Sequence, residues 1–403
     1  MFDILYAGIE GIYSMPHQRE RTITPVLLKR MKLWPVLGII GQRQCGKSTL
    51  LREILTRYIR MNYTTMDSEN FRKRAEHSPE SFSEPEPGKV NVIDEVQKVP
   101  SLFDAVKLHV DQKRRPGTFI LSGSTEFSSL TGIRESLTGR IGILNLYPFN
   151  LSEIHSKKFG KYFIKPGKYS AQVSLTEFDR KITSGGMPGF FYLHSKEEYS
   201  AAAQLWIETT SYRDLGRVLK KNFDGDLALS ILTELAQTEF PTASEIGSRL
   251  EKDPRIILRY LEGFTKILVL KRITPHLKGV GKHHYVIFDS GLATFLGASR
   301  KAALRSHVLV EALSFFEASG LNHPQVEYYR SEKKSYIPLI FSWKNERKTC
   351  AVQISDREVP SLGEVKSLES LSLRLQMPMR TLVLSQAQHS YVEKGVEFHP
   401  LRG

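Results

Sequence analysis

The sequence predicts an α/β fold in which a parallel sheet carries a phosphate-binding loop, with a winged helix and a second, smaller α/β unit after it. Three observations predict this order. Residues 35–155 alternate short apolar runs with amphipathic stretches, as parallel α/β sheets do. Residues 41–48 have the spacing of a loop that cradles phosphates. Residues 225–290 show three helical patterns and then two strand-like runs joined by a basic glycine turn.

Five apolar runs are the expected strands of the parallel sheet. Each run is short and is bounded by polar or glycine-containing segments, which is typical of buried strands. The segments between them have apolar residues at helical spacing. The expected strands are residues 36–40, 62–67, 90–94, 117–123 and 142–148, and the expected helices are residues 48–60, 101–112 and 126–139.

The segment GQRQCGKS, residues 41–48, lies between the first expected strand and the first expected helix, which is the setting that a phosphate loop needs. Gly41 is expected to turn the chain sharply at a positive φ, and Gly46 to let backbone N–H groups approach phosphate oxygens. Lys47 can reach the β- and γ-phosphates, and the Ser48 hydroxyl can hold Mg²⁺. An ordinary glycine-rich turn is the alternative, and the flanking strand and helix argue against it.

A second signal is the acidic pair Asp94 and Glu95, which ends the apolar run 90–94. An acid at the carboxyl end of a strand beside a phosphate loop can hold Mg²⁺ through water. The carboxylate that follows can polarise an attacking water. Two adjacent acids could also be surface residues at a strand end, but their position after a phosphate loop favours the metal and water roles.

Composition narrows the class of protein. A chain of 403 residues should form two or three domains. Cys45 and Cys350 have neither metal-site spacing nor a disulfide framework, which suits a reducing cytoplasm. No apolar stretch has the length of a membrane span, and the first residues lack the features of a signal peptide. The formal charge of +14 favours nucleic acid or an anionic membrane surface as partner, with a solvated basic surface as the alternative.

Changes in composition and in hydrophobic pattern divide the chain into five segments. The stretch 155–172 is basic, contains glycine and proline, and is expected to be a linker or an exposed loop. The expected divisions are an N-terminal segment at 1–34, the phosphate-loop core at 35–155, a linker and helical region at 156–224, a winged helix at 225–297 and a C-terminal α/β unit at 298–403.

The expected winged helix has clear helix-start signals. Thr242 and Glu245 have the spacing of a capping box, and Asp253 and Pro254 should begin the third helix. The third helix of a winged helix is the usual reader of a DNA groove. A protein-binding winged helix with a solvated basic face is the alternative. The residues expected to bind DNA from this helix are Arg255, Arg259 and Lys266.

Several stretches are distinctive when taken together: GQRQCGKSTLL, VIDEVQKVPSLFDAVKLHVD, FILSGSTEF, SLTGRIGILNLYPFNLSEI and GGMPGF, with SYRDL and VIFDSGLATFL further on. They resemble the family of bacterial and archaeal ATPases that pair an AAA-type core with a DUF4143 C-terminal region. The resemblance covers nearly the whole chain. It implies an AAA+ P-loop NTPase core with a parallel sheet, followed by a winged helix and a restriction-endonuclease-like α/β domain.

The resemblance also implies ATP and Mg²⁺ as cofactors. Ser48 and Asp94 would hold the metal, and Lys47 and Glu95 would act in catalysis. The residues that would surround ATP are Gly41, Gln42, Arg43, Gln44, Cys45, Gly46, Lys47, Ser48 and Thr49. Cys45 stands where the family usually has an apolar residue.

Two further roles are implied by the resemblance. A small polar residue after the fourth strand should sense the γ-phosphate, and Ser124 is the first choice, with Ser122 the second. Arg140, in the stretch LTGR, would act as an arginine finger toward a neighbouring subunit. A structural ion pair is the alternative for Arg140.

The C-terminal unit departs from the family, which often has nuclease-like acids and a lysine there. The corresponding stretches, SYIPLIF and CAVQIS, lack them, so this domain is expected to be degenerate and nuclease activity to be absent. Pro338 suits an edge strand, and Gln353 cannot carry the charge of a lysine. Glu311 is expected to be a solvated or capping residue, and Glu327 or Asp356 could replace a missing acid.

The leading hypothesis is a Mg²⁺-dependent ATPase that acts on DNA as a motor or remodeller in recombination or repair. An AAA-type core followed by a winged helix resembles branch-migration motors and origin-licensing ATPases. Such rings need an arginine from the next subunit, so a homo-oligomer is implied, with a hexamer as one form. The alternative is an ATP-dependent switch whose winged helix binds a protein partner. A small-molecule kinase fits poorly, because kinases of this fold have no attached winged helix.

Overall fold

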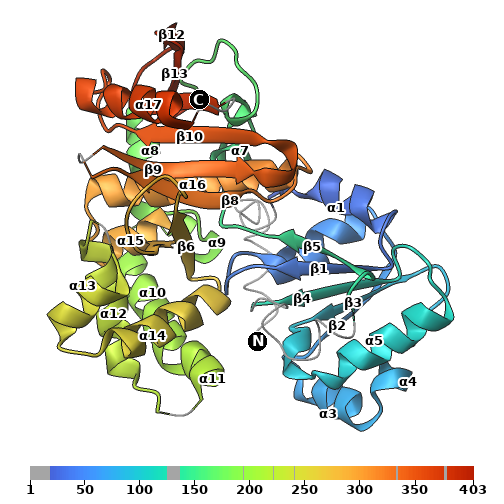
Figure 1. The fold of residues 1–403 in the computed structure, drawn as a ribbon. Coiled ribbons are helices and arrows are strands. Elements are labelled where there is room, and N and C mark those ends of the chain that lie inside the picture. The colour runs from blue at the N-terminus through green and yellow to red at the C-terminus, as the bar shows by residue number, and fades with distance from the viewer. Residues whose placement is uncertain are drawn as a thin grey trace, which may run out of the picture.

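The computed structural model describes residues 19–124, 137–193, 195–220, 222–239, 241–332, 335–375 and 379–403. Figure 1 shows three regions of the molecule. A sheet with its helices is coloured blue to cyan-green, a group of helices is coloured green to yellow, and a second sheet is coloured orange to red. The first region holds the expected phosphate loop.

The core is an α/β fold on a five-stranded parallel sheet, as predicted, with strand order β2-β3-β4-β1-β5. Because β4 lies between β1 and β3, the carboxyl ends of these three strands meet at one edge of the sheet. The strands are Val36–Ile40 (β1), Met61–Thr65 (β2), Val90–Asp94 (β3), Phe119–Gly123 (β4) and Ile141–Asn145 (β5).

Helices cover both faces of the core sheet. The expected helix 48–60 is irregular, because a short α-turn passes into a π-turn and then a 3-10 turn. The expected helix 126–139 lies mostly outside the described residues. The elements are α1 (Thr24–Met31), α2 (Lys47–Thr49), η2 (Leu50–Ile54), η3 (Leu55–Arg57), α3 (Glu69–His77), α4 (Pro79–Ser83), η4 (Val96–Lys98) and α5 (Ser101–Gln112), the last at its predicted bounds.

The stretch 155–172 is not simply the exposed loop that its composition predicted. Phe159, Tyr162 and Phe163 are buried in an apolar cluster with residues of the C-terminal unit. The aromatic side chains anchor the stretch, and its lysines stay toward solvent. The helical elements around and after it are α7 (Leu151–His155), η6 (Lys161–Phe163), α8 (Leu175–Ser184), α9 (Pro188–Phe191), α10 (Lys196–Glu208), η7 (Thr209–Asp214, a π-helix) and α11 (Leu215–Leu219).

Residues 225–287, here called the helix–hairpin segment, contain the elements expected of the winged helix in the expected order. These are α12 (Gly225–Gln237), α13 (Ala243–Leu250), α14 (Pro254–Lys266), β6 (Leu270–Pro275) and β7 (His284–Ile287). The capping box of Thr242 and Glu245 is formed, and the Asp253 side chain caps α14 with Pro254 at its start. Leu261 and Phe264 of α14 are buried in the core of this segment.

The C-terminal sheet continues from the hairpin, because β6 pairs in parallel with β8. This eight-stranded sheet has the order β12-β13-β11-β10-β9-β8-β6-β7, so it crosses the boundary expected near residue 297. The remaining elements are α15 (Ser290–Phe295), α16 (Arg300–Ala318), β8 (Gln325–Arg330), β9 (Tyr336–Trp343), η8 (Lys344–Glu346), β10 (Lys348–Ile354), α17 (Leu362–Leu375), β11 (Met379–Ser385), β12 (Tyr391–Glu393) and β13 (Val396–Pro400).

Pro338 is not on an edge strand, so that expectation is wrong. Strand β9 lies between β8 and β10. Its pairing with β10 ends at Leu339 and Val352, and the register with β8 shifts between Glu327 and Tyr329. Proline has no N–H to donate, and this irregularity accommodates it in an interior strand.

Helix α16 joins the C-terminal unit to the core. Its residue Glu317 accepts hydrogen bonds from the backbone and side-chain nitrogens of Asn145, both at 3.2 Å, and lies 3.4 Å from Arg30 of α1. Burial raises the pKa of Glu317 to about 7. In the described part of the chain, no helix combines the length and the apolar character that a membrane crossing requires.

Candidate nucleotide-binding site

The phosphate loop follows β1 at the carboxyl edge of the core sheet. Gly41 has no positive φ, so the expected reason for this glycine is wrong. A Cβ at Gly41 would stand 2.4 Å from the carbonyl oxygen of Leu146 and 2.6 Å from the sulfur of Cys45. Glycine is therefore needed for close packing. The positive φ values belong to Gln44, at 62°, and Gly46, at 97°.

Lys47 lies inside the curve of the loop. Its Nζ donates to the carbonyl oxygens of Gly41 at 2.9 Å and Gln42 at 3.2 Å, and the side chain is buried. The carboxylate of Glu95 is 4.0 Å from the same nitrogen. Ser48 and Thr49 follow at the first turn of α2 and line the adjacent cleft. The ammonium group is thus held at the place where a phosphate in the loop would meet it.

Asp94 is buried and is fixed by three hydroxyl groups. Ser48 Oγ donates to one carboxylate oxygen at 2.6 Å and Tyr63 Oη to the same oxygen at 2.7 Å. Ser122 Oγ donates to the other oxygen. Burial, and then the Asp94 charge, raise the pKa of Tyr63 well above its usual value, so its hydroxyl stays protonated as a donor. Ser48 and Asp94 therefore present two oxygen ligands of the kind that Mg²⁺ prefers.

Glu95 has a left-handed backbone, with φ 55° and ψ 40°. Residues other than glycine rarely take this conformation. The Glu95 carboxylate lines the cleft, whereas Asp94 is buried. The amide of Gln97 donates to this carboxylate, and Ser124 Oγ lies 3.3 Å from it. Ser122 is fully buried against Asp94, whereas Ser124 lines the cleft. Of the two candidate sensors, Ser124 has the accessible hydroxyl.

Arg21 is hydrogen-bonded to the backbone of the phosphate loop. This contact was not predicted from the sequence. Its guanidinium donates to the carbonyl oxygens of Cys45 at 2.9 Å and Tyr147 at 2.6 Å. It also pairs with Glu153 at 3.1 Å, and both side chains are almost fully buried. Residues 1–34 were expected only to form an N-terminal segment, with no role for Arg21. The two acceptors lie in the loop and after β5, so only the fold brings them to Arg21.

The loop faces a cleft of about 870 Å³, which lies between the core and the helices that follow it. Volumes of this size are typical of small-molecule sites. Six of the described lining residues are basic and three are acidic, which suits an anionic ligand. The opposite wall is formed by Pro188, Trp206, Arg213, Asp214, Arg217, Val218, Ile267 and Val269 among others.

Two stretches noted for their family resemblance meet the phosphate loop at this wall. In GGMPGF, the sulfur of Met187 accepts a hydrogen bond from Gln42 at 2.8 Å. In SYRDL, Asp214 forms an ion pair with Arg43 at 3.1 Å. These contacts were not predicted, because 145 and 171 residues separate the partners.

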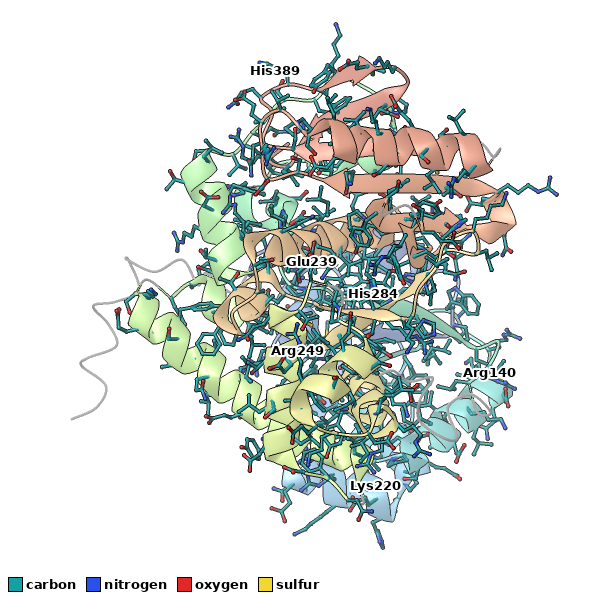
Figure 2. The ribbon with its side chains drawn as sticks, turned by 60° about the vertical axis from the view of Figure 1, so that its left-hand side comes forward. Arg140, Lys220, Glu239, Arg249, His284 and His389 are labelled. Carbon is teal, nitrogen blue, oxygen red and sulfur yellow. The ribbon has the colours of Figure 1, made fainter. Side chains whose placement is uncertain are left out.

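Arg140 lies directly before β5, at the amino-terminal edge of the sheet and thus at the end opposite to the phosphate loop. Its guanidinium pairs with Asp111 at 2.6 Å and 3.0 Å. Figure 2 shows Arg140 at the outer end of the core. Within one chain it does not approach Lys47 or Glu95. A finger role therefore requires a second subunit, and it stays a prediction beside the structural ion pair.

The three expected DNA-binding residues of α14 are in different settings. Arg255 is 90% exposed and pairs with Asp253, which precedes it, at 2.7 Å. Arg259 donates to the carbonyl oxygen of Asn222 and lies 5.4 Å from the ring centroid of Tyr260. Lys266 is exposed. Arg255 and Lys266 are thus available at the surface, and Arg259 is held by its own chain.

In the C-terminal unit, Glu311 is a buried capping residue. Its carboxylate accepts a hydrogen bond from the backbone N–H of Leu151 at 2.9 Å, at the start of α7. Burial raises its pKa to about 7. Glu327 accepts a hydrogen bond from Ser342, and Gln353 donates to the carbonyl oxygen of Tyr336. Asp356 is exposed after β10, so these groups serve separate contacts.

The comparisons with known proteins agree with the core. Residues 34–155 match the family model described as AAA domain. This part of the chain is therefore an AAA-type ATPase domain, and the Ser48, Asp94 and Glu95 constellation lies within it. The match ends before the second half of the chain, so the expected DUF4143 region has no support from it.

Two mycobacterial relatives extend over most of the chain. The uncharacterized proteins Mb2031c of Mycobacterium bovis and Rv2008c of Mycobacterium tuberculosis are each 24% identical over 370 residues, covering 89% of this chain and 78% of the relative. Their names state no activity.

Two solved structures resemble the chain more distantly. The Walker-type ATPase PABY2304 of Pyrococcus abyssi is 16% identical, covering 68% of this chain and 94% of its own, with a TM-score of 0.41. The signal transduction ATPase with numerous domains PH0952 of Pyrococcus horikoshii, which has a tetratricopeptide repeat sensor, is 12% identical, covering 75% and 48%, with a TM-score of 0.26. Both TM-scores are below 0.5, so the assignment of the core rests on the AAA match and the loop geometry.

Proposed function

We propose that this protein is a Mg²⁺-dependent ATP hydrolase. In this proposal, the binding and hydrolysis of ATP change the position of the helix–hairpin segment. The observation that carries the proposal is the set of hydrogen bonds and ion pairs that joins Lys47, Ser48, Asp94 and Glu95 at one edge of the sheet. The cleft beside them is lined from its other side by residues up to Val269, so the bound nucleotide would contact both halves of the chain.

The residues divide the work of hydrolysis. The loop N–H groups and Lys47 bind the phosphates and stabilise charge on the β- and γ-phosphates. Glu95 faces the cleft and orients and polarises the attacking water, which works because its carboxylate is held by Gln97 and by Ser124. In this proposal Ser124 donates to the γ-phosphate, and its place in the lining of the cleft supports that role.

Mg²⁺ would be held by Ser48 and, through water, by Asp94. The donors fit this ion, because a hydroxyl and a carboxylate already lie 2.6 Å apart beside the loop. When bound, Mg²⁺ neutralises phosphate charge that develops in the transition state.

We further propose DNA as the partner of α14, with contacts to phosphates through Arg255 and Lys266. The excess of basic residues in the chain, with a formal charge of +14, supports this proposal. One observation favours a protein partner as the second candidate. Ile256 and Leu258 of the same helix are 41% and 36% exposed, and apolar side chains add little to a phosphate contact.

A homo-oligomer is proposed on the position of Arg140. It lies at the edge of the sheet that is remote from its own phosphate loop, so it can act in catalysis only on the site of another subunit. The turnover per subunit should then rise with protein concentration.

ATP turnover tests the first proposal. Wild-type protein should release phosphate from ATP only when Mg²⁺ or a similar divalent ion is present, and Lys47→Ala should abolish this release. Lys89→Ala is the matched control, because Lys89 pairs with Glu86 at the exposed surface of the same domain. Equal turnover in wild type and Lys47→Ala would show that the activity does not arise at this loop.

The partner is tested by turnover and binding with duplex, single-stranded and branched DNA at several salt concentrations. Phosphate contacts predict binding that weakens steeply with salt, and Arg255→Ala with Lys266→Ala should lower the affinity by about tenfold or more. Arg249→Ala is the matched control, since Arg249, labelled in Figure 2, lies on α13 and forms an ion pair with Glu234. Absence of DNA binding at low salt would favour the protein partner.

A further inference from the structure

The ion pair between Arg43 and Asp214 is a direct charged link between the phosphate loop and the helical wall of the cleft. Arg43 Nη1 lies 3.1 Å and 3.2 Å from the two carboxylate oxygens. Arg213 Nε donates to the same carboxylate at 3.0 Å. One carboxylate thus holds two guanidinium groups, one from each side of the cleft.

Asp214 is tied closely to the helix–hairpin segment. It ends the π-helix η7, and π-helical turns often mark functional sites. The next residue, Leu215, packs so closely on α14 that a Cβ at Gly263 would stand 2.6 Å from its side chain. A Cβ at Gly225, at the start of α12, would stand 2.1 Å from the ring of Tyr212. A displacement of Asp214 must therefore move α12 and α14 with it.

The ion pair between Arg43 and Asp214 is partly exposed, so a bound ligand can replace it. The Arg43 side chain is 40% exposed and that of Asp214 is 18% exposed, so water screens the pair and its contribution is small. Arg43 lies within the loop, so a bound triphosphate brings several negative charges close to it. Arginine binds phosphate strongly, and the same charges repel the Asp214 carboxylate.

We propose that a nucleoside triphosphate competes with Asp214 for Arg43, and that this exchange couples nucleotide binding to the position of the helix–hairpin segment. Asp214 is then a positioning residue that acts through Arg43 and Arg213. The proposal rests on the proposed ATP site and names the contact by which that site reaches the second half of the chain.

A double-mutant cycle on nucleotide affinity tests the exchange. Calorimetry with a slowly hydrolysed ATP analogue and Mg²⁺ gives the dissociation constant for wild type, Asp214→Asn, Arg43→Gln and the double variant. Asp214→Asn removes the competitor, so it should tighten binding in the wild-type background, and by about fivefold more than it does in the Arg43→Gln background. Asp214→Glu should restore the wild-type affinity.

Coupling must also work in the reverse direction. The analogue should speed hydrogen exchange in residues 209–219 of wild type, because the link to the loop is weakened, and should not do so in Asp214→Asn. Glu234→Gln is the matched control. It breaks the ion pair with Arg249, which lies within the helix–hairpin segment and away from the cleft. It should leave the analogue-dependent change intact.

The outcomes separate this inference from the proposed function. If the wild-type protein binds no nucleotide, the proposed function and the exchange at Arg43 are both refuted. If nucleotide binds but Asp214→Asn changes affinity by the same factor in both backgrounds, the exchange is refuted and the ATP site stands. An unchanged analogue-dependent exchange pattern in Asp214→Asn would refute it as well.

Discussion

Replacing Arg21 by Met should destabilise the core and weaken nucleotide binding together. The guanidinium is 3% exposed and pairs with Glu153, which is 1% exposed. Removing one partner of a buried pair leaves an uncompensated charge, which costs about 3–5 kcal/mol. Glu153 keeps donors from Thr22 and Asn150, so the cost should be near the lower end, at about 3 kcal/mol. The methionine keeps much of the apolar contact of the arginine stem.

Urea unfolding followed by the fluorescence of Trp34 measures this cost. Trp34 packs against Gly142 in the core, and Trp206→Phe with Trp343→Phe makes it the reporter. The midpoint for Arg21→Met should fall by about 1 M or more. Because Arg21 donates to the loop carbonyl of Cys45, nucleotide affinity should fall at temperatures where the variant is folded.

Two controls sharpen the Arg21 experiment. Arg57→Met breaks an exposed pair with Glu20 and should cost less than about 1 kcal/mol. Adding Glu153→Gln to Arg21→Met removes the stranded charge, so the double variant should be less destabilised than the sum of the single variants. A free energy of unfolding within about 0.5 kcal/mol of wild type for Arg21→Met would refute the role of this buried pair.

Three further predictions concern catalysis, assembly and pH. Glu95→Gln should bind ATP and slow hydrolysis by about 10²–10⁴-fold, because Asp94 stays intact and the water loses its polarising carboxylate; single-turnover rates equal to wild type would contradict this. Arg140→Ala should lower turnover without loss of ATP binding if it acts across subunits, whereas unchanged turnover would leave only its ion pair with Asp111. The pKa of Glu317 is raised from 4.5 to about 7, so the wild type loses stability as pH rises through this range. The melting temperature of Glu317→Gln relative to wild type should therefore increase from pH 4.5 to 7, and a constant difference would show that the Glu317 carboxylate does not titrate there.

The sequence by itself determined those helices, strands and motifs whose residues lie close together in the chain. The strand–loop–helix context of residues 41–48 and the acids that end the run 90–94 predicted the ATP site, because each signal lies within one short element. Apolar spacing predicted β1, β3 and α5 at their observed bounds, and capping residues placed the start of α14 at Pro254. Local propensity is sufficient for such elements, since their backbone hydrogen bonds lie within or beside them.

Other features were decided by the tertiary structure, because they depend on residues far apart in the chain. Arg21 lies in the expected N-terminal segment 1–34, and only the fold buries it against Glu153. Gly41 is required by the carbonyl of Leu146, which is distant in sequence. The pair of Arg43 and Asp214 spans 171 residues, and neither residue type indicates the other. A charged side chain in a sequence has many possible partners, and the packing of the elements selects one.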